Sequence, residues 1–566
     1  MGNENKMIIY QVLPRLFGNT NNVLVKNGTI SENGVGKFSD FTIETLSEIK
    51  KTGITHIWYT GVIEHATQTD YSSYGISNDH HAIVKGKAGS PYAIKDYYDV
   101  DPDLADHVPE RMQEFEALIE RTHQAGMKVI IDFVPNHVSR QYYSDAKPPH
   151  IQDLGQYDDR SKAFDSNNNF YYLPNQCLNV HFAPNHNHIE YSEFPAKVTG
   201  NDCFHAYPTE NDWYETIKLN YGVDYANGGD CYFDPVPDTW QKMLDILLFW
   251  QEKGVDGFRC DMAEMVPVEF WGWVIPKVKA AGNSCFIAEV YNPALYRDYI
   301  ARGCFDYLYD KVGLYDTLRD VICGKASPCA ITQCWQAVEG IQHNMLYFLE
   351  NHDEQRIASD FFAGSAVRGF AGMIVAATMY TNPVMIYFGQ EFGERGMDEE
   401  GFSGRDGRTT IFDYWGLECI RNWINNQRFD GVLLTEEQKS LYQSYEKLMQ
   451  IAGTEQAIRR GQFFDLMYAN PQLGEHRMYA FLRVYEQEVM LIVVNFHNEA
   501  QTVQIAIPSE AFQRLSIPDN QAAKLTDLLD DKQTISTLTI ACPYRITIPA
   551  YSGKLLKFDY KSNTAK

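Results

Sequence analysis

The sequence has no long hydrophobic run. Nowhere do about 18 apolar residues follow one another, so we expect no membrane-spanning helix. The first residues, MGNENKMIIYQVLPRLF, also lack the apolar core of a secretory leader, and the stretch from Met7 to Val12 fits a first β-strand better. These two absences predict a cytoplasmic protein.

Basic residues are scarce relative to acidic ones. The chain has 49 Lys and Arg residues against 74 Asp and Glu residues, a formal net charge of −25 at pH 7. A surface with this charge repels phosphates, so we expect neither nucleic acid nor an anionic membrane as a partner. A neutral ligand would be indifferent to the field. Aromatic residues make up 13 % of the chain, and their flat faces suit both core packing and stacking against sugar rings.

Closely spaced cysteine pairs are also missing. The 11 cysteines include no CxxC motif, which argues against the common structural zinc sites. The count is odd, and Cys260 and Cys285 lie within apolar segments, so we interpret the cysteines as free thiols in a reducing compartment. Cys177, Cys203 and Cys231 occupy a loop-rich segment, where an exported protein would be able to form a disulfide.

The sequence does contain a recurring unit of helix end, glycine and short apolar strand. The unit occurs at residues 51–59 (KTGITHIWY), 124–132 (QAGMKVIID), 253–261 (KGVDGFRCD) and 280–289 (AAGNSCFIAE). Helices that alternate with apolar strands indicate a parallel sheet covered by helices. Further strand candidates, which bring the number to eight, are residues 8–12, 305–309, 345–349 and 384–388. Eight such units predict a closed (β/α)8 barrel, with functional residues at the C-terminal ends of its strands.

The spacing of these units predicts two additional parts. Between the third and fourth strands lie about 120 residues, where a plain barrel needs about 30. Residues 138–235 are rich in Asn, Asp, His, Tyr and Pro, which predicts an irregular domain inserted on the third βα loop. After a helix at 435–451, short alternating segments within residues 454–566 predict an antiparallel β-sandwich domain. The barrel itself then comprises residues 1–137 and 236–453.

Polar residues gather at the ends of the predicted strands. Strand four ends in GFRCD, and because a strand has period two, Arg259 and Asp261 must lie on the same side. Strand five delivers Glu289, and strand seven delivers His352 and Asp353. Three carboxylates that converge on one rim are better explained as a catalytic site than as solvated loop charges. Strand three ends in IDFVPNH, which contributes Asp132, Asn136 and His137.

Two of these carboxylates are candidates for glycosidase chemistry. Such enzymes place one carboxylate as nucleophile or base and a second as acid. Arg259 favours the ionised form of Asp261, which a nucleophile requires, although a purely structural ion pair is the alternative for this segment alone. Glu289 follows the apolar segment CFIA and has no neighbouring arginine in the sequence. Burial should therefore favour its neutral form and suit it to act as the acid.

Four motifs carry a resemblance to a known family. DFVPNH, GFRCDMAE, AEVY and ENHD, in this order, resemble the signature regions of the α-amylase family, glycoside hydrolase family thirteen. The resemblance extends over nearly the whole chain, from the barrel through the insertion to the C-terminal β domain. It implies a retaining enzyme that acts on α-glucosidic bonds, with Asp261 as nucleophile, Glu289 as acid/base and Asp353 as transition-state stabiliser.

The same matching implies a set of substrate contacts. His137 and His352 would bind hydroxyls of the sugar ring, and Arg259 would orient Asp261. Tyr92, in SPYAIKDYYDVDP, resembles the family's stacking tyrosine, with Asp96 nearby; a packed loop tyrosine is the alternative. The implied substrate is an α-glucan or a maltooligosaccharide, and no cofactor is required for its cleavage.

Two positions bear on specificity and on metal binding. Typical α-amylases have a Lys-His pair three and four residues after the nucleophile, whereas this chain has Glu264 and Met265. DMAEM is closer to the DVANE of neopullulanase and cyclomaltodextrinase relatives, and Glu264 becomes a candidate substrate contact. Asn136 resembles a calcium ligand of many family members, and the oxygen-rich insertion would have to supply the other ligands of a structural calcium ion.

The motifs leave three functions open. The first is hydrolysis of α-1,4-glucosidic bonds. An α-glucan transglycosylase or an α-1,6-acting relative would use the same residues, with a sugar hydroxyl or a different linkage in the same pocket. A non-catalytic carbohydrate-binding or scaffold relative would have no need of the three carboxylates, which argues against it.

Overall fold

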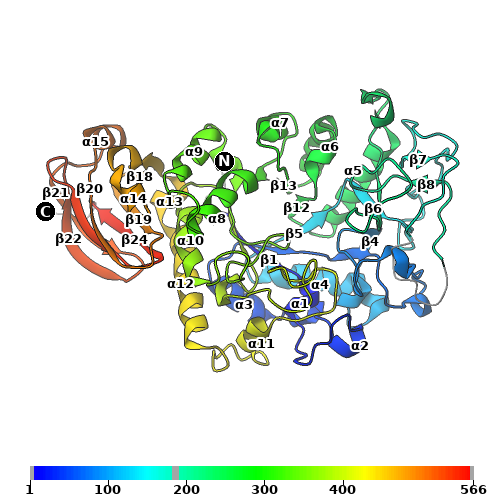
Figure 1. Ribbon diagram of the computed structural model, residues 1–566, viewed down its shortest axis with the longest axis horizontal. Coiled ribbons are helices and arrows are strands. Elements are labelled where there is room, and N and C mark those ends of the chain that lie inside the picture. Colours follow the sequence, from blue (N-terminus) through cyan, green and yellow to red (C-terminus); the bar gives the residue numbers. More distant parts are fainter. Residues whose placement is uncertain (1–5, 181–189, 561–566) are drawn as a thin grey trace.

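The computed structural model describes residues 6–180 and 190–560. Its centre is a ring of parallel strands (Figure 1). The order around the ring follows the chain: β1 (Ile8–Val12), β2 (His56–Tyr59), β5 (Lys128–Phe133), β12 (Gly257–Cys260), β13 (Cys285–Ala288), β14 (Tyr307–Tyr309), β15 (Met345–Leu346) and β16 (Val384–Tyr387). A bridge between Tyr347 and Val384 closes the ring. The predicted (β/α)8 barrel is confirmed, and each of its strands overlaps a predicted segment, with β5 extending one residue beyond it to Phe133.

Alternate residues of these strands fill the inside of the barrel. The strand residues Ile9, Trp58, Ile130, Ile287, Tyr309, Leu346 and Met385, with Met7, Tyr315 and Phe348 from outside the strands, form one buried apolar cluster. Gly257 lies in register with Ile130, and a Cβ atom there would come within 3.3 Å of the Ile130 Cγ1 atom. Because side chains alternate along a strand, Arg259 points to the same interior side, above the apolar layer.

Helices cover the outside of the ring. The longer ones are α3 (Ile43–Lys51), α4 (Arg111–Gln124), α5 (Asp238–Glu252), α6 (Val268–Ala281), α10 (Val367–Thr378) and α12 (Glu436–Thr454). Shorter helices are α1 (Pro14–Phe17), α2 (Ile30–Asn33), α7 (Tyr296–Ala301), α8 (Asp316–Ile322), α9 (Ala330–Ala337) and α11 (Glu418–Ile424). The start of α12 is fixed by a capping box, in which the Thr435 hydroxyl accepts the Gln438 N–H at 3.2 Å. This is the helix expected at residues 435–451.

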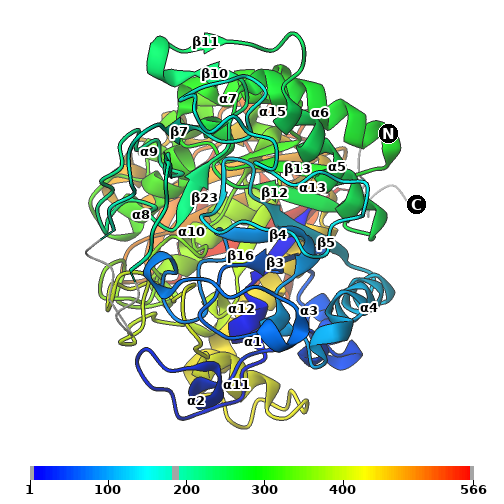
Figure 2. The same ribbon diagram turned by 90° about the vertical axis from the view of Figure 1, so that its right-hand side faces the viewer.

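The long interval between β5 and α5 holds the inserted segment. Its described residues form small antiparallel pairs: β6 (His137–Ser139) with β9 (Thr216–Lys218), β7 (Tyr172–Leu173) with β8 (Ala196–Lys197), and β10 (Val223–Asp224) with β11 (Asp230–Cys231). A separate apolar cluster, which includes Tyr171 and Val198, supports them. The segment lies at the end of the molecule opposite the C-terminal sheet (Figure 2). The boundary predicted between residues 137 and 138 falls inside β6, so His137 belongs to a strand that pairs with the insertion.

A second hairpin extends from the barrel after β2. Its strands are β3 (Ile63–His65) and β4 (Ile94–Val100), and their pairing is irregular on both sides of Glu64. Every residue of β4, from Ile94 to Val100, is buried. The hairpin packs beside β6, so the second and third βα connections are in contact.

The C-terminal part is an antiparallel sheet packed at one side of the barrel (Figure 1). Its order is β17 (Gln462–Asp465), β18 (Met478–Tyr485), β19 (Glu488–Asn495), β24 (Ser552–Asp559), β21 (Gln521–Asp527) and β22 (Lys532–Leu538). The remaining elements are α13 (Gln456–Arg460), α14 (Gln472–Glu475), α15 (Ser509–Leu515) and the pair β20 (Gln501–Ile505) and β23 (Tyr544–Ile548). The sequence gives little sign of β21, in which Leu525 is the only large apolar residue, or of β22, which is mostly exposed and polar.

Two features of the sequence have simple structural counterparts. All 11 cysteines are free thiols, Cys177, Cys203 and Cys231 among them. Among the described residues, no helix combines the length and the apolar character needed to cross a membrane.

Candidate active site

Arg259 holds two carboxylates at the mouth of the barrel. It lies on β12, and its Nη1 atom is 2.7 Å from Oδ1 of Asp261, two residues further along the same side of the chain. Its Nη2 atom is 2.8 Å from Oε2 of Glu289, which follows β13. The guanidinium is fully buried and also donates to the Tyr309 hydroxyl at 3.2 Å. The predicted pairing of Arg259 with Asp261 is thus present, and the same guanidinium also binds Glu289.

Glu289 has hydrogen-bond donors on both of its carboxylate oxygens. The Met262 N–H donates to Oε2 at 2.7 Å, and the Tyr291 hydroxyl donates to Oε1 at 2.5 Å. Burial, followed by the Glu289 charge, raises the pKa of Tyr291, so this hydroxyl keeps its proton and remains a donor. Glu289 has no neighbouring arginine in the sequence, but β12 brings Arg259 beside it, a contact that sequence neighbours do not reveal.

Asp353 is fixed by a row of side chains that crosses the barrel mouth. The Gln11 amide donates to His352 Nδ1 at 2.7 Å, which leaves the ring proton on Nε2. That atom lies 3.0 Å from Asp353 Oδ2 and 2.6 Å from the Tyr92 hydroxyl. The Tyr92 ring also stacks on the His352 ring, with centroids 5.2 Å apart. Tyr92 and His352 therefore orient Asp353.

The three carboxylates share one cavity of about 320 Å³. Its wall also contains His137 and Tyr92, and further lining residues that the sequence analysis did not single out are Lys85, Ser90, Trp213, Glu215, Thr216, Met262, Tyr291, Phe402, Ile411 and Phe412. The wall thus combines carboxylates with flat aromatic faces, which suits a ligand that is polar at its edge and apolar on its face.

Electrostatics distinguish Asp261 from Asp353. Burial raises the pKa of Asp261, Arg259 opposes this shift, and the Glu289 charge adds to it. Arg259 lowers the pKa of Asp261, as predicted, but the sequence does not show how this effect compares with the opposite effect of burial. Desolvation also opposes ionisation of Asp353, yet His352 and the Arg259 and Arg408 guanidinium groups hold its pKa below the ordinary value.

His137 is a neutral imidazole at this site. Burial, together with the Lys218 and Lys85 ammonium groups, lowers the pKa of His137 to about 3. Its Nε2 atom lies 4.0 Å from Asp261 Oδ2, and its ring lies beside that of Trp213. A neutral imidazole in the cavity wall is suited to hydrogen bonding with a hydroxyl group, as expected from the sequence.

Four predicted substrate contacts do not line the cavity. The carboxylate of Asp96 is occupied by the Ser144 hydroxyl at 2.6 Å and by the backbone N–H groups of Tyr98 and Ala146. Glu264 accepts the N–H groups of Tyr291 and Asn292 at 3.1 and 3.0 Å. Asp96 therefore stabilises the start of the insertion, and Glu264 holds the loop that carries Tyr291. Their assignment as substrate contacts is corrected, because neither lines the cavity. His352 and Arg259 also lie behind the carboxylates and not in the wall.

The prediction of calcium at Asn136 does not fit the structure. The Asn136 amide oxygen accepts the Lys218 ammonium at 2.9 Å, and the same ammonium is 2.5 Å from Asp202 Oδ1. The Asn136 amide nitrogen donates to the Gly200 carbonyl at 2.8 Å. A lysine thus supplies the positive charge between barrel and insertion, and its Nζ atom would repel a calcium ion at this place.

Several functional side chains escaped the sequence analysis. Tyr291 is two residues after Glu289 in AEVY. The period of a strand, which places Arg259 and Asp261 on one side, also predicts that Tyr291 lies on the same side as Glu289. Gln11 lies at the end of the first strand and had the same signal. Trp213 comes from the irregular insertion, and no local pattern connects it with the barrel.

The chain resembles known proteins over most of its length. Residues 11–272 match the family described as alpha amylase, catalytic domain. Neopullulanase 2 of Thermoactinomyces vulgaris is 20 % identical over 88 % of this chain and 71 % of its own length. The amino acid transporter heavy chain SLC3A1 of Homo sapiens is 25 % identical, over 46 % of this chain and 29 % of its own length.

A solved structure has a similar fold. The crystal structure of the alpha-amylase from Geobacillus thermoleovorans, complexed with acarbose, superposes with a TM-score of 0.63, covers 98 % of each chain and is 20 % identical in sequence. The family match, the neopullulanase relative and the barrel geometry agree with the resemblance found in the motifs. Residues 11–272 of this chain therefore match an alpha-amylase catalytic domain, and the chain shares its fold with a solved alpha-amylase.

Proposed function

We propose that this protein cleaves α-1,4-glucosidic bonds of α-glucans or maltooligosaccharides with retention of configuration. Asp261 is the nucleophile, Glu289 the acid/base and Asp353 the stabiliser of the transition state. The observation that carries the proposal is the shared guanidinium: Arg259 binds Asp261 through Nη1 and Glu289 through Nη2. Carboxylates on neighbouring nitrogens of one guanidinium lie close together, which favours the separation of about 5–5.5 Å of retaining enzymes over the about 6.5–9.5 Å of inverting ones.

In the first step a carboxylate of Asp261 attacks the anomeric carbon of the bound sugar. The bond to the leaving oxygen breaks, and Glu289 gives its proton to that oxygen. Asp353, held ionised by its surroundings, faces the positive charge that develops on the ring.

In the second step Glu289 acts as a base. It takes a proton from water, and the resulting hydroxide oxygen displaces Asp261 from the anomeric carbon. Tyr92 and Trp213 are positioned to pack against the faces of sugar rings.

The test follows the anomer that is released first. Proton NMR during early hydrolysis of maltoheptaose should show the α-anomer, and initial β-anomer would exclude retention. The Asp261→Asn variant should retain its fold by circular dichroism and lose activity by several orders of magnitude, because an amide cannot attack the sugar carbon. Full turnover in that variant would assign the chemistry to another residue.

Product analysis separates the alternatives. Chromatography of reactions on maltoheptaose, pullulan and cyclodextrin distinguishes hydrolysis from transglycosylation and α-1,4 from α-1,6 cleavage. Longer oligosaccharides than the starting one would indicate transfer to a sugar hydroxyl. Binding of maltoheptaose without any turnover would indicate a non-catalytic relative. The cluster of three carboxylates does not support that alternative.

A further inference from the structure

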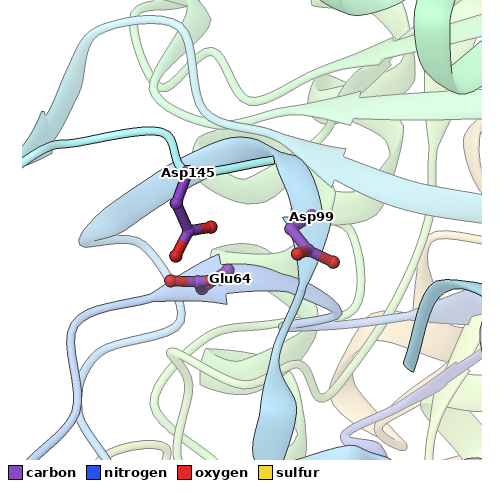
Figure 3. A group of neighbouring side chains, drawn as sticks. All are labelled: Glu64, Asp99 and Asp145. Atoms are coloured by element: carbon purple, nitrogen blue, oxygen red, sulfur yellow. The ribbon is translucent and has the colours of Figure 1, made fainter. Parts of the chain in front are cut away.

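A group of three carboxylates lies where the β3–β4 hairpin meets the inserted segment. Glu64 is on β3, Asp99 is on β4, and Asp145 is in the loop after β6 (Figure 3). One carboxylate oxygen from each residue lies within 4.8 Å of the other two. None of the three lines the active-site cavity, so the group is separate from the proposed catalytic centre.

Glu64 is the unusual member of this group. It is only 1 % exposed, and its Oε2 atom has no hydrogen-bond partner. Figure 3 shows its carboxylate directly below that of Asp145, with the Asp99 carboxylate to the right of both. Burying an ionised carboxylate without a partner is costly, so Glu64 must either carry a proton or face a positive charge.

The surrounding side chains do not supply enough positive charge. Within the described chain, the only basic side chain in an ion pair with the group is Arg111, whose Nη2 atom is 2.5 Å from Asp99 Oδ2. Lys95, on the same strand as Asp99, is paired with Asp79 at 2.9 Å. Three carboxylates against one guanidinium leave an excess of negative charge in a largely buried place.

We propose that Glu64, Asp99 and Asp145 bind a divalent cation, for which calcium is the best match. An all-oxygen ligand set is typical of hard cations, and calcium accepts irregular geometry with 6–8 ligands at about 2.3–2.6 Å. Asp145 is exposed, so water can reach the site and complete the coordination. The ligands come from both the hairpin and the insertion, and the cation joins these two parts. Tyr92 lies two residues before β4, so the same cation supports the loop that orients Asp353.

Calcium binding to the full-length protein tests this site directly. After dialysis against a chelator, isothermal titration with CaCl2 should show one bound ion, and thermal unfolding should shift upward when calcium is added. Glu64→Gln keeps the shape of the side chain and removes its charge, and Asp145→Asn does the same at an exposed position where folding is not at risk. Each variant should weaken calcium binding by about 100-fold or more and abolish the calcium-dependent shift in Tm.

The matched control is Glu110→Gln, the same chemical change at an exposed position outside the group. It should bind calcium as the unmodified protein does. Three results would overturn the proposal: no binding of calcium to the unmodified protein, unchanged binding in Glu64→Gln and Asp145→Asn, or a Glu64→Gln variant that is more stable than the parent in saturating calcium. The last result would show that Glu64 is a protonated, buried acid.

Discussion

At the scale of single residues, Arg259 determines the charge arrangement of the active site. Its planar guanidinium reaches Asp261 and Glu289 through two different nitrogens and leaves Nε for the Tyr309 hydroxyl. A lysine ammonium is a compact point charge on a flexible stem and cannot satisfy both carboxylates with the same geometry. The two residues are therefore not interchangeable here.

We expect Arg259→Lys to reduce kcat by about 10²–10³-fold, the loss typical of removing a preorganised charge contact. KM should change less, because Arg259 does not line the cavity. Kinetics on a chromogenic maltoside, with thermal unfolding as the check on folding, measure both effects. Unchanged kcat in a folded variant would mean that the two carboxylates do not depend on the shared guanidinium.

A second residue-scale effect concerns a buried acid outside the active site. Burial raises the pKa of Glu391 to about 7, although the Tyr10 hydroxyl, which donates to Oε1 at 2.7 Å, opposes the shift. The ordinary pKa is 4.5, so below that pH both folded and unfolded chains hold the proton and folding carries no penalty. As pH rises towards 7 the unfolded chain ionises first, and the folded state loses stability.

Glu391→Gln should therefore raise Tm at pH 8 and leave it almost unchanged at pH 4.5. The amide keeps the acceptor for Tyr10 and has no charge to bury. Glu350→Gln is the matched comparison, because burial also raises the pKa of Glu350 to about 7 but its carboxylate binds buried Arg356 at 2.9 Å. That variant should lower Tm at pH 8, since it leaves a guanidinium without its partner. Equal effects of the two substitutions would contradict this reading.

At the scale of elements, the buried ammonium group of Lys218 attaches the inserted segment to the barrel. Lys218, at the end of β9, has a side chain that is only 2 % exposed and joins Asn136 beyond β5 to Asp202 within the insertion. Asn136 is next to His137 in sequence, so this attachment also fixes one wall of the cavity. Gly200 is close by, and a Cβ atom there would come within 2.9 Å of the His137 Cβ atom.

Lys218→Met should destabilise the protein by about 1–3 kcal/mol, because the buried Asn136 amide oxygen loses its donor. Urea unfolding measures the loss, and limited proteolysis should show earlier cleavage within residues 138–235. Lys162→Met is the control, since the Lys162 ion pair with Asp165 is exposed. It should change stability very little. A Lys218 variant as stable as the control would rule out the attachment.

At the scale of the whole molecule, one buried arginine joins the C-terminal sheet to the barrel. Arg483, on β18, donates to the carbonyl oxygens of Met379, Ala457 and Ile458 at 2.9, 3.1 and 2.8 Å. The first of these carbonyls follows barrel helix α10, and the others belong to α13. Burial lowers the pKa of Arg483 to about 9. The arginine has no carboxylate partner among these contacts and binds backbone dipoles instead.

Arg483→Ala should uncouple the two parts. Three buried carbonyls lose their donor, each at a cost of about 1–3 kcal/mol, so the C-terminal sheet should melt before the barrel and calorimetry should resolve two transitions. Arg545→Ala, at an exposed position on β23, should leave a single transition. One cooperative transition in both variants would show that apolar packing alone holds the sheet to the barrel.

The sequence by itself determined the barrel and the candidate catalytic carboxylates. Apolar strands that alternate with helices have few ways to bury their surface, and the period of a strand places Arg259 and Asp261 on one side. The motif order then identified Asp261, Glu289 and Asp353, which the structure gathers in one cavity. These features depend on residues that are close in the chain, and so they can be read from local patterns.

Only the tertiary structure decided the partners of those residues. Arg259 and Glu289 are 30 positions apart and meet because β12 and β13 are neighbours in the ring. Lys218 meets Asn136 because β9 pairs with β6, which replaces an expected calcium ion with an ammonium group. Asp96 was assigned to the substrate from its nearness to Tyr92 in sequence, yet alternation along β4 turns it toward Ser144. Hydrogen bonds and ion pairs act over a few ångströms in space, and separation along the chain does not encode that distance.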